Sequence, residues 1–445
     1  MSVRSPRTMN KPRWRALTVA AVLLLALIPS AAPNASAHLR GHQYGAAADP
    51  SAVDPAAVVA WNQLAVTTLV GDASKLPPET ILDMGLVQAA VYDAVVGVTR
   101  GYRPYVFTLR APRGSSAPAA AAAAAHQILV TYTPYAATTL DAAYVSSLAA
   151  ISDGWAKTAG AAYGNAVANY LIALRSNDGR SAPVLFTQPP GPGVWRPTPP
   201  ANLAMFDPWL GGVTPLLVHS ATQFGPRLPP PSLTSEQYTR DFNEVKDYGS
   251  ATSALRTPDQ TATAKFFSGN AVVQYNAALR DQVTVRHLDI ARAARMFAAI
   301  DMSVADTIIS VWHSKLLYGF WRPITAINFA ETDGNEDTVA EPTWTPLIVT
   351  PAYPDYVSGY NGYTAAFSAG LEELFGTRHL HLTLISSAVP DVRMYDSGAQ
   401  LRSDVVNARI WLGIHFRFAD TAARQMGVSL ARWTLDRYFQ PTGHH

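Results

Sequence analysis

The sequence predicts an all-α protein. Apolar residues recur at helical spacing along most of the chain, and pairs that favour a helix start, such as Asp54-Pro55 and Thr257-Pro258, precede several of these stretches. The N-terminal half has no clear alternation of apolar and polar residues. Nearly half of the 445 residues are apolar, enough for a large core. We therefore expect helical bundles in two halves, joined by a long Pro-rich connector.

Residues 1–37 have the features of a signal peptide. Five basic residues precede an apolar run at 16–28 that is too short to span a bilayer, and Ala35-Ser36-Ala37 offers the small residues that signal peptidase reads. We expect a secreted mature chain that begins near His38, with an uncleaved membrane anchor as the alternative. No later stretch of about 18 apolar residues is free of charge, so no membrane partner is expected after leader removal.

The charge balance and the lack of cysteine exclude several classes. Loss of residues 1–37 lowers the formal net charge from +2 to about −3, and no basic cluster lies elsewhere, so the sequence predicts no nucleic-acid binding. The absence of cysteine excludes disulfides and thiolate metal sites.

The N-terminal half, residues 38–176, reads as a series of helices. One apolar stripe at helical spacing follows Asp54, and a second helix is expected over about 78–98. The alanine run at 119–125 continues into apolar residues, which predicts a close-packed helix rather than a linker. Two further helices are expected at 136–151 and 152–176.

Residues 177–232 form the connector. Thirteen prolines, among them Pro189, Pro190 and Pro229, exclude continuous helix, while Trp195 and Trp209 indicate that the loop packs against the core. A loop this long is often functional, so it either walls the substrate entrance or is an inert link.

The C-terminal half, residues 233–445, returns to helical patterns. We expect helices over 235–248 and 257–267, then one long helix or a broken pair over about 285–328, followed by a helical run after Ser358. The chain is expected to end with a helix from about 403 and another over 420–439.

Two cations in this half carry the functional argument. If 285–328 is one helix, Lys315 and Arg322 lie two turns apart on the same face, because seven residues return to within ~20° of the starting direction. Their neighbours are mostly apolar, and buried cations are costly without an anion. Alternatively each cation pairs with a carboxylate or reaches solvent.

Two later segments add further groups that bind anions. Ser358 and Gly359 precede a helical run, where a hydroxyl and a backbone N–H suit a tetrahedral anion. Arg409 and His415 follow in the segment 407–420. Together with Lys315, these groups are typical of a site for phosphate or vanadate.

These segments resemble the signature of the vanadium-dependent haloperoxidases and the related type 2 phosphatidic acid phosphatases. That signature is Lys-x6-Arg-Pro, then Pro-Ser-Gly-His, then Ser-Arg-x5-His. The first part is intact at 315–323, and Arg409 and His415 keep the third, although Ala408 replaces its serine. The second part reads Val-Ser-Gly-Tyr, with Tyr360 where the histidine is expected.

The resemblance implies a helical haloperoxidase fold with vanadate as cofactor. His415 would be the sole protein ligand to vanadium, with Lys315, Arg322 and Arg409 neutralising the oxygens and Ser358 and Gly359 completing the cradle. His415, Lys315 and Tyr360 are then the predicted catalytic residues, while Trp312 and Tyr353 fall where the family lines its halide side. The implied partners are hydrogen peroxide, a halide and a small organic acceptor.

The histidine missing at position 360 leaves alternatives open. A phenol titrates near 10 and an imidazole near 6.5, so Tyr360 is a poor proton shuttle, although it can donate a hydrogen bond to an anion. His313, His379 or His381 could substitute for it. The chain could instead be a phosphatase with His415 as nucleophile, in which the role of Asp420 in orienting His415 is in doubt, or a secreted anion-binding or non-redox homologue. A homodimer is also left open.

Overall fold

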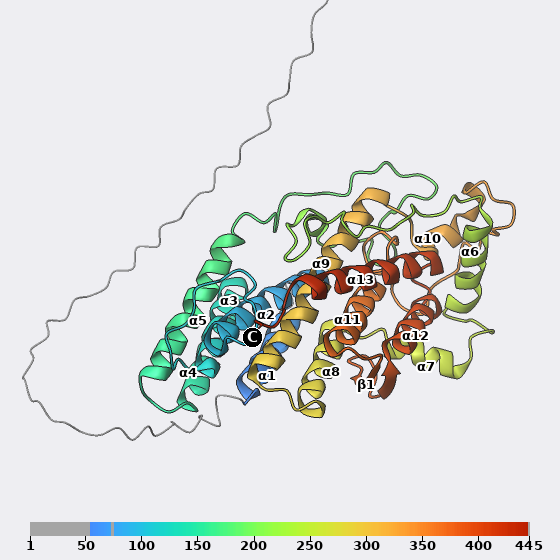
Figure 1. Ribbon diagram of the computed structural model, residues 1–445. Coiled ribbons are helices and arrows are strands. Elements are labelled where there is room, and N and C mark those ends of the chain that lie inside the picture. The colour runs from blue at the N-terminus through green and yellow to red at the C-terminus, as the bar shows by residue number, and fades with distance from the viewer. Residues whose placement is uncertain (1–53, 73–74, 444–445) are drawn as a thin grey trace, which may run out of the picture. The chain divides into compact units, whose positions relative to one another are not determined.

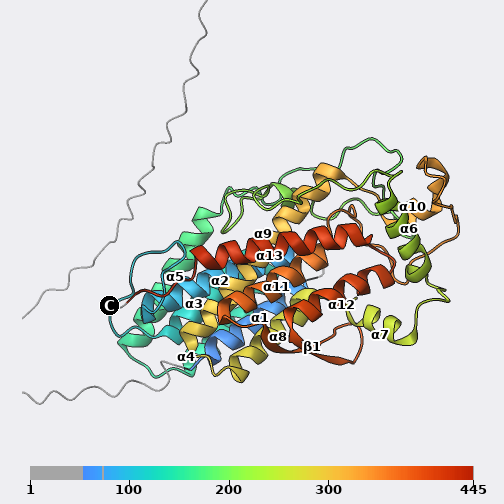
Figure 2. The ribbon, with the colours of Figure 1, turned by 45° about the vertical axis from the view of Figure 1, so that its right-hand side comes forward.

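The computed structural model describes residues 54–72 and 75–443. These residues form a helical fold with one short hairpin, so the predicted all-α class is confirmed (Figures 1 and 2). The predicted signal peptide at 1–37 lies outside the described residues, as do the terminal His444 and His445.

Five α-helices precede the connector, and their bounds lie close to the predicted ones. They are α1 (Ala56–Gly71), α2 (Pro77–Thr99), α3 (Ala117–Tyr132), α4 (Ala137–Ala149) and α5 (Trp155–Leu174). The alanines at 119–125 are fully buried, as expected for a close-packed helix. Helix α5 approaches α3 closely, because a Cβ at Gly164 would clash with the backbone of Ala120.

Helix α2 is a core helix that packs along α9 (Ile290–Tyr318). In the part of the chain that the structure describes, it alone is long and apolar enough to pass as a membrane span, but 89% of its apolar window is buried inside the fold.

The connector at 177–232 contains one short 3-10 turn, Pro208–Gly212, within its irregular course over the helices (Figure 1). It is anchored to α9 by Asp306, whose carboxylate accepts hydrogen bonds from the backbone N–H groups of Leu216, Leu217 and Val218. Trp312 of α9 also donates its indole N–H to the carbonyl of Phe206 (3.0 Å). The described residues from 54 onward belong to one compact unit, so a division at the connector stays a prediction.

The C-terminal part carries the remaining elements, with α11 and α13 packed along each other and against α9. Its elements are α6 (Glu236–Gly249), α7 (Pro258–Phe266), α8 (Ala271–Val285), α9, α10 (Pro323–Asn328), α11 (Gly359–Phe375), β1 (His379–Ile385), β2 (Val392–Ser397), α12 (Gly398–Trp411) and α13 (Arg417–Arg437).

The broken helix pair is confirmed, and the single-helix geometry for Lys315 and Arg322 is wrong. Helix α9 ends at Tyr318 because Gly319 adopts a left-handed conformation (φ 54°), and Pro323 then opens α10. Lys315 is therefore in the last turn of one helix, while Arg322 is the residue before the next. A turn of the chain, and not a shared helix face, brings the two cations together.

Three elements, α8, β1 and β2, were not predicted. Helix α8 begins after Asn270, whose side chain accepts hydrogen bonds from the N–H groups of Val272 and Val273. Strands β1 and β2 form an antiparallel hairpin, in which Leu380, Leu382 and Leu384 are buried and alternate with more exposed residues.

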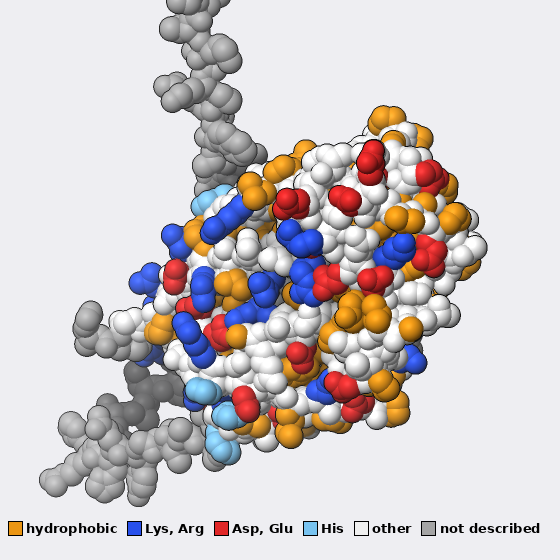
Figure 3. Space-filling view, turned by 90° about the vertical axis from the view of Figure 1, so that its right-hand side faces the viewer, with side chains coloured by type: hydrophobic (Ala, Val, Ile, Leu, Met, Phe, Trp, Pro, Cys, Tyr) orange, Lys and Arg blue, Asp and Glu red, His pale blue; other side chains and the backbone are white. Residues whose placement is uncertain are grey.

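On the face of the molecule turned toward the viewer in Figure 3, basic and acidic side chains lie interspersed.

Candidate active site

Lys315 lies at the end of α9 and is fully buried. Its ammonium donates hydrogen bonds to the carbonyls of Pro354 (2.6 Å) and Asp355 (3.0 Å). It also lies 4.9 Å from the ring centroid of Tyr353 and 5.8 Å from that of Trp312. Burial, and then the nearby Arg322, lower the pKa of Lys315 well below its usual range. Burial thus disfavours the charged form of this amine, and an anion bound nearby would stabilise that form.

Arg322 is also fully buried and binds two loops. Its Nε donates to the carbonyl of Tyr353 and its Nη1 to the carbonyl of Ile414, both at 2.7 Å. Nη1 lies 3.3 Å from Nε2 of His415. The second terminal nitrogen, Nη2, is buried and has no hydrogen-bond partner among the described residues.

Arg409 lies in the last turn of α12 and is 6% exposed. Its Nη1 donates to the carbonyl of Phe267 (2.8 Å), and its guanidinium carbon lies 4.7 Å from the ring centroid of Tyr360. Its Nε is buried without a partner in the part of the chain that is described. Like Arg322, Arg409 therefore keeps an unused donor.

His415 is oriented by a carboxylate that the sequence analysis did not identify. Its Nδ1 lies 2.5 Å from Oδ1 of Asp355, and both side chains are buried. Burial raises the pKa of Asp355 to about 7, and burial beside the three cations lowers the pKa of His415 well below its usual range. A neutral imidazole that donates from Nδ1 to a carboxylate keeps its lone pair on Nε2, as a metal-ligating histidine requires, and here that atom faces Nη1 of Arg322 at 3.3 Å.

Asp420 makes no hydrogen bond with His415, which it was considered to orient, and instead binds residues at the start of α11. Its Oδ1 accepts a hydrogen bond from Asn361 (2.7 Å), and Ser358 also bonds to it. Burial raises the pKa of Asp420 well above its usual range. Asp420 thus holds Ser358 and Asn361 at the start of α11, while Asp355 orients His415.

Ser358 and Gly359 lie where the chain enters α11. Ser358 is fully buried and precedes the helix, although its hydroxyl does not cap the helix. Gly359 begins the helix, and a Cβ there would lie 3.4 Å from the ring of Trp312. The backbone at Gly359 therefore passes close to the indole ring of Trp312.

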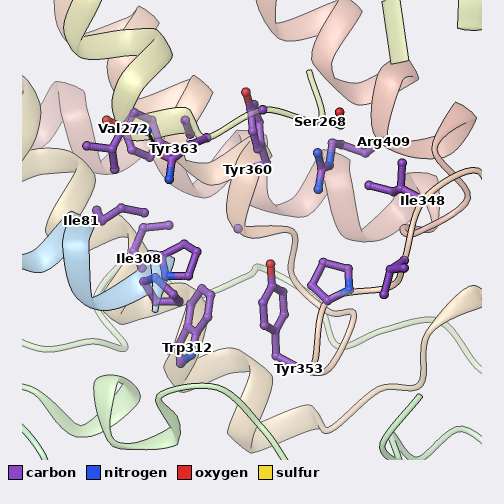
Figure 4. Close-up of a pocket in the computed structure, with 18 residues that line it drawn as sticks. Ile81, Ser268, Val272, Ile308, Trp312, Ile348, Tyr353, Tyr360, Tyr363 and Arg409 are labelled. Atoms are coloured by element: carbon purple, nitrogen blue, oxygen red, sulfur yellow. Dashed lines mark hydrogen bonds between the residues drawn. The ribbon is translucent and has the colours of Figure 1, made fainter. Parts of the chain in front are cut away.

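The hydroxyl of Tyr360 is engaged elsewhere. It donates to Oε1 of Gln274 on α8 (2.7 Å), and burial raises its pKa above the usual range. In Figure 4 its oxygen points away from Trp312 and Tyr353. Of the other histidines considered, His313 lies 3.3 Å from the carbonyl of Gly211 in the connector, and His379 and His381 belong to the hairpin β1–β2.

A cavity of about 400 Å³ lies beside these groups (Figure 4). Arg409 and Gly359 line it together with Trp312, Tyr353 and Tyr360, while Lys315, Arg322 and His415 lie behind this wall, buried. The described residues that line the cavity include none from 177–232, so the connector does not wall this entrance and instead packs behind Trp312. The sequence analysis had singled out these five lining residues but not the residues at 268–272, for which the Asn270 cap that starts α8 was a readable signal.

The residues fit vanadate. Two buried guanidinium nitrogens of this site lack partners among the described residues, the pKa of Lys315 is depressed, and the nearby carboxyls of Asp355 and Asp420 have raised pKa values, so the site favours an added negative charge. Lys315, Arg322 and Arg409 can neutralise oxyanion oxygens, and His415 offers Nε2 as a ligand.

Comparison with known proteins agrees with this geometry. Residues 295–443 match the family model for the second helical-bundle domain of VCPO. Vanadium chloroperoxidase from Curvularia inaequalis is 28% identical over 180 residues, a match that covers 30% of this chain and 29% of that protein. The chain thus matches less than a third of the length of this curated relative.

Solved structures with the same fold cover most of the chain. The crystal structure of the first bacterial vanadium-dependent iodoperoxidase superimposes with a TM-score of 0.77 at 21% identity, covering 89% of this chain and 100% of that one. A bacterial vanadium-dependent chloroperoxidase in its holo form gives a TM-score of 0.66 at 16% identity, covering 82% and 93%. Residues 295–443 thus match the second helical-bundle domain of VCPO, and the chain as a whole shares the fold of these vanadium-dependent haloperoxidases.

Proposed function

We propose that this protein is a vanadate-dependent haloperoxidase that oxidises halide with hydrogen peroxide. The observation that carries the proposal is the set of buried cationic donors around His415, two of which lack partners among the described residues. When bound, vanadate supplies Lewis-acid activation of the peroxide.

The chain's own residues have separable roles in this proposal. His415 would hold vanadate through Nε2, while Asp355 accepts the hydrogen bond from Nδ1 of His415 and fixes the orientation of the ring. Lys315, Arg322 and Arg409 offset negative charge, most strongly where it grows during the reaction. Their burial keeps water out, which strengthens each of these electrostatic contacts.

The decisive experiment is a vanadate titration of the metal-free protein. Bromination of a small acceptor that depends on peroxide and saturates with added vanadate supports the proposal, and Lys315→Met should reduce it strongly. Activity that does not depend on vanadate would refute it.

The proposal includes the absence of an acid or base at position 360. Tyr360 keeps its proton because burial raises its pKa, and its hydroxyl donates to Gln274. Halide oxidation should therefore be slow, and Tyr360→His should accelerate it, because an imidazole titrates near neutral pH. No gain in Tyr360→His would contradict this account of the position.

A phosphatase is the second candidate, favoured by the pairing of Asp355 with His415. A carboxylate behind an imidazole also raises its nucleophilicity, as a phosphohistidine mechanism requires. Hydrolysis of an aryl phosphate that vanadate inhibits would assign this function. Vanadate binding with neither activity would assign a non-redox or anion-binding protein.

We further propose secretion after cleavage before His38, acting on a small organic acceptor without a membrane or nucleic-acid partner. Mass spectrometry of the exported chain tests the cleavage, and sedimentation of the same material distinguishes a monomer from a homodimer.

A further inference from the structure

We infer that the cavity beside the anion site binds a neutral aromatic molecule, which serves as the organic acceptor of the halogen. This inference rests on the proposed haloperoxidase function. The cavity has about 400 Å³, within the range of pockets that hold small organic ligands. It therefore has room for a molecule of one to three rings.

The cavity has two distinct ends (Figure 4). At one end lie Ile81 of α2, Val272 of α8 and Ile308 of α9, so three helices build an apolar wall. At the other end lies Arg409, with its guanidinium at the edge of the cavity. A molecule bound against the apolar wall would extend along the cavity toward the groups that hold the anion.

The charges of the lining select against ionic acceptors. Arg409 is the single charged side chain among the described residues of this wall, and it already serves the anion site. A polyanionic or cationic acceptor would find no second partner and would have to lose its hydration. A neutral molecule avoids that cost.

The lining also favours an aromatic ring over a plain aliphatic chain. Trp312 and Tyr353 form the floor, with ring centroids 5.0 Å apart, and Tyr360 and Tyr363 close the opposite side. Aromatic faces and edges at these positions offer stacking and edge-to-face contacts to a bound ring. Both floor residues lie next to Lys315, so the ring would be held next to the site of halide oxidation.

Halogen transfer in this cavity balances with the reagents of the proposed function. Hypohalous acid reacts with an aromatic C–H to give an aromatic C–halogen bond and water. The halogen gains two electrons, the ring carbon loses two, and the ring proton leaves with the hydroxide of the hypohalous acid. No further oxidant is required.

Binding of 2-naphthol to the full chain, measured by calorimetry in phosphate buffer, which fills the anion site, and without vanadate, peroxide or halide, tests the inference. We expect saturable binding with one site per chain, and no binding of naphthalene-2,6-disulfonate. Absence of saturable 2-naphthol binding, or equal binding of the disulfonate, would overturn it. Because no cofactor is present, this result is independent of whether the protein oxidises halide.

A matched pair of substitutions locates the binding site. Val349 lines the cavity mouth and is 67% exposed, whereas Val392 on β2 is 59% exposed and lies outside the cavity lining. A large ring at either exposed position leaves the core intact. Val349→Trp should weaken 2-naphthol binding roughly tenfold or more by obstructing the mouth, and Val392→Trp should not change it. Equal affinities in the two variants would place the 2-naphthol site elsewhere and overturn the inference.

The failure of the proposed function looks different. Iodide oxidation to triiodide needs no organic acceptor, so a protein that binds 2-naphthol but never forms triiodide with vanadate and peroxide would refute the haloperoxidase. In that case the cavity would also lose its role as a halogen acceptor site. Triiodide formation without 2-naphthol binding would instead refute only the acceptor cavity.

Discussion

Buried charges in two regions of this molecule are satisfied in opposite ways. Asp93 on α2 and Asp306 on α9 each accept hydrogen bonds from three consecutive backbone N–H groups, at 105–107 and 216–218 respectively. All six distances lie between 2.5 and 2.9 Å. Burial raises the pKa of each carboxyl to about 6, and the amides partly offset that rise. The chain itself supplies every partner these carboxylates use.

The cations around His415 differ from these carboxylates. Lys315 and Arg322 have carbonyl partners, but buried nitrogens of Arg322 and Arg409 have no partner among the described residues. Asp93 and Asp306 are thus paired by the backbone, whereas Arg322 and Arg409 each keep one buried nitrogen without a partner among the described residues.

The largest expected effect is on His415. His415→Ala removes the group offered as vanadate ligand, and we expect vanadate affinity, measured by equilibrium dialysis, to fall about a thousandfold. His381→Ala is the matched control, because this histidine lies on the hairpin with a side chain that is 68% exposed. Equal affinities in the two variants would erase the distinction between the two regions.

Asp93 tests the other side of the comparison. Asp93→Ala leaves three N–H groups at 105–107 without their acceptor, and we expect the free energy of unfolding in urea to fall by about 3 kcal/mol. Asp396→Ala on the exposed hairpin, with a side chain that is 81% exposed, is the control. A loss no larger than that of the control would show that the carboxylate is not what holds this loop.

Asp355 connects the two regions, because it is a paired carboxylate that acts on the ligand site. Asp355→Ala should weaken vanadate binding roughly 10- to 100-fold, since His415 loses the acceptor for its Nδ1 proton. Asp355→Asn should restore most of the affinity, because the amide oxygen accepts the same bond. Nitrogen NMR of the imidazole should show the Nδ1–H tautomer in the parent and in the Asn variant. The same tautomer in the Ala variant would contradict this role.

The sequence allowed the helical class to be predicted, and it identified most of the buried groups that the structure gathers around His415. The spacing of Lys315 and Arg322 pointed to a pair that the structure does bring together, but for a wrong geometric reason, because Gly319 ends α9 between them. The resemblance depends on the order of the three segments, and that order does not require a shared helix. Gly319 itself was a readable stop signal, since glycine favours the left-handed conformation at helix ends.

Other features had weaker signals or none. The alternation of Leu380, Leu382 and Leu384 predicts a strand, and the Asn270 cap predicts α8, so both elements were readable from the sequence. Asp355 lies in an irregular loop, where no periodicity reports which way a side chain points. Its pairing with His415, 60 residues away, depends on tertiary structure alone.

Asp301 sharpens the comparison, because only one of its two carboxylate oxygens has a hydrogen-bond partner among the described residues. Oδ1 accepts from Asn276 (3.3 Å), while Oδ2 is buried without a partner among the described residues. Burial raises its pKa to about 7. A carboxyl whose folded pKa exceeds its unfolded value contributes stability below the unfolded pKa and loses it as pH rises through the folded pKa.

The free energy of unfolding of the parent should therefore fall between pH 4 and 7.5 relative to that of Asp301→Asn, by on the order of 2 kcal/mol. Urea titrations of both proteins across this range measure the difference. Parallel curves would mean that Asp301 carries its charge at no cost, and that Oδ2 has a partner in solution.

The smallest expected effect is at Tyr360, which the comparison assigns to the internally paired groups. Tyr360→Phe removes the hydroxyl that donates to Gln274 and leaves Oε1 of that buried amide without its donor, so the free energy of unfolding should fall by about 1 kcal/mol. Tyr170→Phe is the matched control, because Tyr170 is 46% exposed and the loss of its hydroxyl should cost less. If Tyr360→Phe instead kept its stability and lost halide oxidation, the hydroxyl would have to turn from Gln274 toward the anion during the reaction. Tyr360 would then belong with Lys315 and the two arginines, as the sequence alone had indicated.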